Sequence, residues 1–188
     1  ASNFAAESDW LYNFIFWVST IAFALTIIAT VYFLLRYRKS VSPEPQPSPT
    51  HSTKLEVIWS VIPSIFLVIM FWKGFEVFVD YRKVPAGAYQ IRVEGMKWNW
   101  TFSYPTGAQS DELHVPMGEP VELLISSKDV LHSVFIPAFR VKQDAVPGRY
   151  TRLWFEATLP GTYPLYCTEY CGTNHSGMGK KVVVHEER

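Results

Sequence analysis

The segment from Trp10 to Leu35 restricts the fold most, because its 26 residues carry no charged side chain. As an α-helix it would be about 39 Å long, more than the roughly 30 Å hydrocarbon core of a bilayer. Aromatic residues typical of membrane interfaces lie near its two ends: Trp10, Tyr12, Trp17, Tyr32 and Tyr37. A signal peptide would be shorter and would follow basic residues, whereas Glu7 and Asp9 precede this segment. We therefore predict a transmembrane helix over about residues 10–36.

A second apolar segment runs from Val57 to Trp72. It would span only about 24 Å as a helix, but Lys73 can extend its charge toward water while apolar residues continue beyond it. Pro63 lies in the first turns, where a missing N–H is tolerated better than in mid-helix. We predict a second transmembrane helix over about 56–79, so that residues 1–80 form a helical hairpin.

The connection between the two helices, residues 40–53, contains prolines at alternate positions, which favours an extended loop. Basic residues flank this loop (Arg36, Arg38, Lys39 and Lys54), whereas the first ten residues have none. The positive-inside rule therefore places the loop in the cytoplasm and both chain ends outside. We expect an integral protein of a bacterial plasma membrane, in preference to a mitochondrial inner membrane, with residues 81–188 on the outer, periplasmic face.

Residues 81–188 show period-two alternation of apolar and polar side chains, interrupted by Gly, Pro and Asp turns, which predicts an all-β sandwich. The expected strands are Tyr89–Glu94, Trp98–Tyr104, Val121–Ser126, His132–Ile136, Tyr150–Glu156, Gly161–Tyr166 and Lys180–Val184.

The charge of the chain excludes a typical nucleic-acid binder, since Lys+Arg and Asp+Glu both number 17. The predicted β domain is also nearly balanced, with twelve basic and eleven acidic residues. The β domain therefore has no overall field of one sign. The candidates for a local acidic patch are Asp111, Glu112 and Asp129.

Potential metal ligands gather in one short stretch that contains Cys167, Cys171, His175 and Met178, and His132 lies upstream. Thiolate, imidazole and thioether groups together select copper. Two neighbouring thiolates can bridge two ions, each completed by one imidazole and one weak axial ligand. Met178 and a backbone carbonyl such as that of Glu169 are candidates for the axial positions.

Three alternatives to a copper site are a Cys167–Cys171 disulfide, a structural zinc site of two cysteines and two histidines, and chance spacing. A disulfide leaves both histidines and Met178 without a role, and zinc has no use for Met178. His51, His114 and His185 are not expected to bind metal.

The stretches Asp129–Ser133, Lys142–Arg149 and Cys167–Met178 together resemble subunit II of the haem–copper cytochrome c oxidases. The hairpin, the aromatic segment Trp98–Tyr104 and the β domain follow in the order of that family. The resemblance implies a cupredoxin-like fold and a dinuclear CuA centre of two copper ions. It also implies association with a haem-bearing subunit I, with other oxidase subunits and with membrane lipid.

The resemblance also assigns residues to roles. It makes His132, Cys167, the carbonyl of Glu169, Cys171, His175 and Met178 the copper ligands. The side chain of Glu169 would contribute to a magnesium site shared with subunit I. Trp98 would receive electrons from cytochrome c or a cytochrome c domain, although it could also be an aromatic residue on a sheet face. Glu56 would lie at the entrance of a proton channel, although a helix dipole also favours an acid there.

The function that the resemblance implies is that of the electron-accepting subunit of a proton-pumping respiratory cytochrome c oxidase. The chain contains no Cys-x-x-Cys-His motif, so haem and the reduction of oxygen to water are expected in subunit I. Alternatives are a quinol-oxidising relative, which lacks the copper ligands, a membrane-anchored copper-delivery module, and nitrous oxide reductase, which the double anchor does not fit. The balanced charge predicts that cytochrome c docking depends only weakly on salt.

Overall fold

The computed structural model describes residues 1–44 and 47–186. It divides the chain into two compact units, one of residues 9–75 and the other of residues 1–8 and 76–188. The predicted loop 40–53 includes residues 45 and 46, and the predicted β domain ends with residues 187 and 188; these four positions lie outside the described residues.

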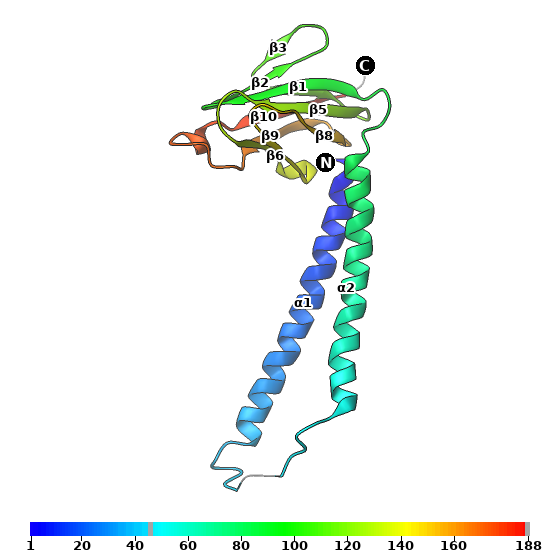
Figure 1. Cartoon of the computed structure of the whole chain (residues 1–188), viewed down its shortest axis with the longest axis vertical. Coiled ribbons are helices and arrows are strands. Elements are labelled where there is room, and N and C mark those ends of the chain that lie inside the picture. Colours follow the sequence, from blue (N-terminus) through cyan, green and yellow to red (C-terminus); the bar gives the residue numbers. More distant parts are fainter. Residues whose placement is uncertain (45–46, 187–188) are drawn as a thin grey trace. The chain divides into compact units, whose positions relative to one another are not determined.

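Two long helices, α1 (Asn3–Arg36) and α2 (Thr53–Arg82), precede the β domain in the chain (Figure 1). Both are long and apolar enough to cross a bilayer, and no residue in the most apolar window of either helix is buried. Exposed apolar side chains on this scale need lipid around them, so the chain is a membrane protein. Each helix extends a few residues beyond the predicted range, because hydropathy marks only the part expected in lipid.

Hydroxyl groups within the apolar helices bond to their own backbone. Thr26, Thr30 and Ser64 each donate to the carbonyl oxygen four residues earlier, at 2.7–2.8 Å. Such bonds satisfy polar groups where water is absent, as a bilayer requires.

The second unit is a sandwich of two five-stranded sheets, as predicted. One sheet has the order β3-β2-β1-β5-β8, with β1 and β5 parallel. The other has the order β4-β10-β9-β6-β7, with β4 and β10 parallel. The strands are β1 (Tyr89–Met96), β2 (Asn99–Ser103), β3 (Gln109–Ser110), β4 (Leu113–Pro116), β5 (Pro120–Ser127), β6 (His132–Ile136), β7 (Val141–Ala145), β8 (Thr151–Glu156), β9 (Gly161–Cys167) and β10 (Lys180–His185).

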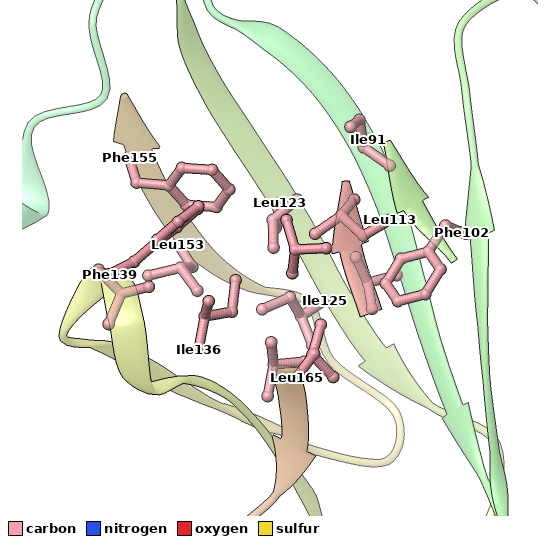
Figure 2. Packing of buried hydrophobic residues seen from close by; sticks show 14 of the residues in the cluster. Ile91, Phe102, Leu113, Leu123, Ile125, Ile136, Phe139, Leu153, Phe155 and Leu165 are labelled. Carbon is pink, nitrogen blue, oxygen red and sulfur yellow. The ribbon is translucent and has the colours of Figure 1, made fainter. Parts of the chain in front are cut away.

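Alternating side chains of both sheets form the core between them, as Figure 2 shows. On β1, for example, Ile91 and Val93 are buried while Arg92 faces outward. Burial of side chains such as Leu123 stabilises the fold by roughly 1.5–3 kcal/mol each. Phe4 joins this core from the start of α1 and packs edge-on against Trp154 with ring centroids 4.9 Å apart.

The structure corrects parts of the strand prediction. β3, β4 and β7 were not predicted, since all three are edge strands of only two, four and five residues. Trp98 does not begin a strand but lies in the turn between β1 and β2. Tyr150 likewise precedes β8.

Candidate metal centre

The first part of the site is built by two paired strands. His132 begins β6 and Cys167 ends β9, and the antiparallel register pairs Val134 with Cys167. The amide of Thr168 continues this pairing by donating to the carbonyl of Ser133 at 3.1 Å. As a result, Nδ1 of His132 lies 3.8 Å from Sγ of Cys167.

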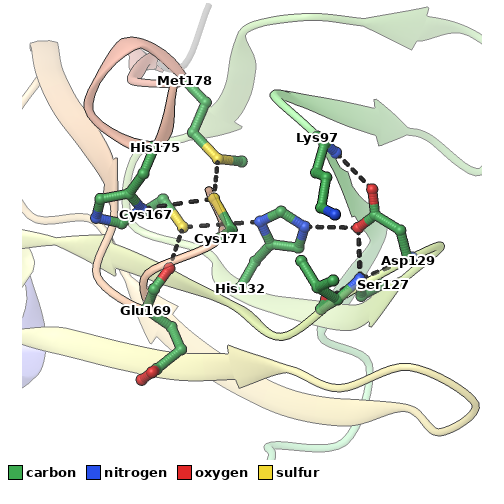
Figure 3. Close-up of polar contacts among 10 residues, drawn as sticks. Lys97, Ser127, Asp129, His132, Cys167, Glu169, Cys171, His175 and Met178 are labelled. Carbon is green, nitrogen blue, oxygen red and sulfur yellow. Dashed lines mark hydrogen bonds and ion pairs between the residues drawn. The ribbon is translucent and has the colours of Figure 1, made fainter. Parts of the chain in front are cut away.

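The loop after β9 folds back over this pair and brings in the remaining groups (Figure 3). The carbonyl oxygen of Glu169 lies 3.3 Å from Sγ of Cys167. Sγ of Cys171 lies 3.5 Å from Nδ1 of His175 and 3.4 Å from Sδ of Met178. The ligand atoms of His132, Cys167 and Cys171 all lie within 4.8 Å of one another, so the structure brings all six predicted copper ligands into one cluster.

The cluster is shielded from water. His132 is fully buried, Met178 and both cysteines are at most 8% exposed, and His175 is half-buried. Both cysteines are free. Burial, together with the neighbouring Cys167, raises the pKa of the Cys171 thiol to about 11. A thiol in such surroundings becomes a thiolate when a cation binds, and these sulfur, imidazole and carbonyl donors fit copper.

Asp129 fixes the orientation of the His132 ring. Its Oδ1 lies 2.8 Å from Nε2 of His132, so Nε2 carries the hydrogen and Nδ1 faces the sulfur atoms (Figure 3). Burial would raise the pKa of the Asp129 carboxyl, but hydrogen bonds from His132 and from the amides of Lys97 and Val130 outweigh it and lower the pKa to about 2. A histidine held by a carboxylate through its second nitrogen is a common arrangement for a metal ligand.

The other side of the His132 ring is enclosed by Trp100 and Gly95. Trp100 is fully buried and meets the ring edge-on, with centroids 5.7 Å apart. A Cβ atom at Gly95 would lie 2.8 Å from the Trp100 ring and 3.3 Å from His132, so a larger residue there would force the Trp100 ring to shift. The sequence did not predict that Trp100 and Gly95 contact His132, because these residues lie on strands from different sheets.

Trp98 connects the cluster with the surface. Its side chain is partly exposed, at 37%, and packs against Gly172, where a Cβ atom would lie 3.2 Å from the indole. Gly172 has φ +120° and directly follows Cys171. The amide of Lys97, the residue before Trp98, donates to Oδ2 of Asp129 at 2.7 Å.

Two predicted roles belong to carboxylates that are not among the six predicted copper ligands. Those six ligands are called the sulfur cluster below: His132, Cys167, the Glu169 carbonyl, Cys171, His175 and Met178. The carboxylate of Glu169 points away from the sulfur atoms in Figure 3, although its carbonyl points toward them. Glu56 belongs to the other unit, in the first turn of α2, where Oε1 lies 2.8 Å from Nδ1 of His51.

The three candidates for an acidic patch are all paired. Asp111 lies 3.4 Å from the ammonium of Lys180, and Glu112 lies 3.5 Å from that of Lys181. Asp129 is engaged by His132 and by backbone amides. The weak dependence of docking on salt stays a prediction.

Comparison with known proteins agrees with the residue pattern. Residues 1–77 match the transmembrane domain of cytochrome c oxidase subunit II, and residues 108–186 match its periplasmic domain. Over 231 aligned residues the chain is 30% identical to cytochrome c oxidase subunit 2 of Cereibacter sphaeroides, covering 100% of this chain and 75% of that protein. The chain is also 28% identical to cytochrome c oxidase subunit 2 of a Synechocystis strain. That match covers 98% of this chain and 70% of the relative.

Solved structures confirm the cupredoxin-like fold of the β domain. The periplasmic domain of subunit II (CoxB) of Bradyrhizobium japonicum superposes with a TM-score of 0.53 at 29% identity, covering 56% of this chain and 89% of that structure. A subunit II domain in a mixed disulfide with a thioredoxin-like protein matches similarly, with a TM-score of 0.50 at 31% identity. This match covers 56% of this chain and 87% of that structure. The chain thus belongs to the family of cytochrome c oxidase subunit II and is a subunit of that oxidoreductase complex.

Proposed function

We propose that this chain accepts electrons from cytochrome c at a dinuclear CuA centre and passes them to haem in subunit I of a proton-pumping oxidase. The observation that carries the proposal is the cluster itself: four donor groups surround two free, buried cysteines next to a partly exposed tryptophan. Nitrous oxide reductase carries such a centre as well, but the two apolar helices of this chain do not fit it.

The residues that would hold copper are His132 and His175 through Nδ1, both cysteine thiolates, Met178 through its thioether, and the Glu169 carbonyl. Bound copper would gain and lose one electron at a time, and this redox change would require no transfer of atoms. The chain would keep that carrier away from water, since the sulfur ligands are buried. Strands β6 and β9 and the Asp129 bond would hold the ligands in place during electron transfer.

Trp98 would be the contact point for the donor. Its exposed part can meet the surface of cytochrome c, while its buried part reaches Gly172 and therefore the backbone next to Cys171. Electrons would thus pass through one side chain, across a van der Waals contact to Gly172, and along the backbone to the proposed ligand Cys171.

The Glu169 carboxylate would serve a magnesium site shared with subunit I. A test uses Mn²⁺ in place of magnesium in the purified oxidase, because Mn²⁺ is visible by electron paramagnetic resonance. Glu169→Gln keeps the carbonyl and removes the charge, so we expect loss of the Mn²⁺ signal with an unchanged copper spectrum. An unchanged Mn²⁺ signal would exclude this role.

Glu56 would lie at the entrance of a proton channel on the side of the basic loop. With the basic loop in the cytoplasm, the β domain would lie on the outer, periplasmic face, and lipid would surround the helices. We expect Glu56→Gln to slow turnover and leave the copper spectrum intact. Glu44→Gln, a change at another acid near this end of the hairpin, is the control, and equal turnover of the two variants would contradict the role.

The proposed centre needs both cysteines as free thiols, which is the state they have in the structure. In the relative that was captured in a mixed disulfide, a thioredoxin-like protein is joined to subunit II. We propose that a similar reductant acts on Cys167 and Cys171, because a disulfide between them would remove both thiolates.

The electron-transfer role is tested by mixing purified oxidase with reduced cytochrome c and following the copper and haem absorption bands. We expect the copper band to respond before haem becomes reduced. We also expect Cys171→Ser to abolish fast haem reduction by cytochrome c. Haem reduction at an unchanged rate in this variant would show that electrons enter elsewhere.

A further inference from the structure

A pair of histidines on the outer face of the second sheet shares no residue with the sulfur cluster. His114 lies on β4 and His185 on β10, and the parallel register pairs Val183 with His114. Alternation buries Leu113, Val115, Val182 and Val184, and it turns both imidazoles outward. Two histidines 71 residues apart in the sequence thus become neighbours on one face.

The two rings meet through single nitrogen atoms. Nδ1 of His114 lies 3.0 Å from Nε2 of His185, and the ring planes differ by 23°. The hydroxyl of Tyr104 accepts a hydrogen bond from the amide of His114 at 2.7 Å and anchors this part of β4. Both imidazoles line a cavity of about 570 Å³, which Tyr104 and the carboxylate-bearing Glu119 also line.

The distance between the two nitrogens suits a metal ion. Two imidazole ligands about 2.0–2.1 Å from one ion, at 90–110° to each other, have nitrogens about 2.9–3.4 Å apart. Imidazole suits zinc, copper and nickel, and among these divalent ions Cu²⁺ binds most tightly. We propose that His114 and His185 form a second metal site, which binds Cu²⁺ in preference to Zn²⁺ and draws its remaining ligands from water.

Binding requires only local changes. The hydrogen that now lies between the rings moves to an outer nitrogen, so both imidazoles stay neutral and both facing nitrogens become ligands. Each ring must also turn so that its lone pair points at the ion. The contact between the two side chains is exposed, so no core packing opposes this rotation. The site offers nitrogen and oxygen donors without a thiolate, which favours Cu²⁺ over Cu⁺.

The test uses the full chain in detergent after its sulfur cluster has been loaded with copper. One further equivalent of Cu²⁺ is added, loosely held metal is removed by dialysis, and copper per chain is measured with electron paramagnetic resonance. We expect one additional Cu²⁺ whose spectrum shows coupling to two imidazole nitrogens. Zn²⁺ should displace it only in large excess.

Three variants complete the experiment. His114→Asn and His185→Asn should each abolish the additional signal, while His51→Asn, which removes a histidine from the loop, should keep it. The spectrum of the sulfur cluster reports whether each variant is folded, and it should not change. Absence of additional copper, or a signal that persists in His185→Asn, would overturn the proposal. Copper in the sulfur cluster serves only as the baseline and the folding readout, so the count of additional copper does not depend on electron transfer by the chain.

Discussion

Nε2 of His132 and Oδ1 of Asp129 lie 2.8 Å apart, and this bond directs the opposite ring nitrogen toward Cys167. The same carboxylate accepts the amide hydrogen of Lys97, next to Trp98. One aspartate therefore positions both a proposed copper ligand and the turn that carries the proposed electron acceptor.

Replacing Asp129 should weaken the centre without unfolding the domain. Asp129→Asn keeps the shape but removes the charge that holds the His132 ring, and loss of such a partner typically costs about 10–100-fold in metal affinity. Because its pKa is about 2, Asp129 is an anion from pH 5 to 8, and the effect should be constant over that range. Competition with a copper chelator measures it. Asp111→Asn, at an exposed carboxylate, should behave like the parent protein, and equal copper retention in both variants would refute the prediction.

Changes at the contact between Trp98 and Gly172 should slow electron transfer selectively. Gly172→Ala places a methyl group 3.2 Å from the indole and strains a backbone with φ +120°, so Trp98 must shift. We expect the rate of copper reduction by cytochrome c to fall by about tenfold, or about 1.4 kcal/mol in barrier height. Trp98→Phe should have at least this effect, and Tyr150→Phe, at another exposed aromatic residue, should have none. A shifted copper spectrum in Gly172→Ala would instead indicate damage to the centre.

A methyl group at Gly95 should destabilise the β domain. The added Cβ would lie 2.8 Å from the buried Trp100 ring, and overpacking of this kind costs about 1–3 kcal/mol of unfolding free energy. Denaturant unfolding of the purified chain, followed by tryptophan fluorescence, measures the change. Gly74→Ala is the control, since its Cβ meets nothing within 4 Å, and it should not destabilise the chain.

Turnover with cytochrome c should depend weakly on ionic strength, since lysines neutralise Asp111 and Glu112. Replacing both Lys180 and Lys181 with Gln would free these carboxylates and should steepen the decline of turnover with salt, provided that the donor is basic. Lys54→Gln, in the helical unit, should leave the slope unchanged. A steep slope in the parent protein would contradict this prediction.

The sequence predicted best those features that depend on local composition. Uncharged runs located both helices, and the types of ligand in Cys167–Met178 with His132 predicted a metal centre. Features that depend on pairing between distant strands were not predictable in the same way. The edge strand β4 is too short to show a clear alternating pattern, so the meeting of His114 on β4 with His185 on β10 was not expected. The placement of Trp98 in a turn and its contact with Gly172 likewise arise from the packing of a loop against a hairpin.

The proposed electron transfer requires a dinuclear copper centre on Cys167 and Cys171, and copper analysis combined with electron paramagnetic resonance can detect one. The full chain in detergent is reduced, loaded with copper and washed with a chelator that competes for surface sites. We expect two tightly held copper ions per chain and a spectrum in which one unpaired electron is shared equally between two copper nuclei. A single copper ion, a preference for zinc, or a Cys167–Cys171 disulfide that persists in the presence of reductant and copper would contradict the proposed centre.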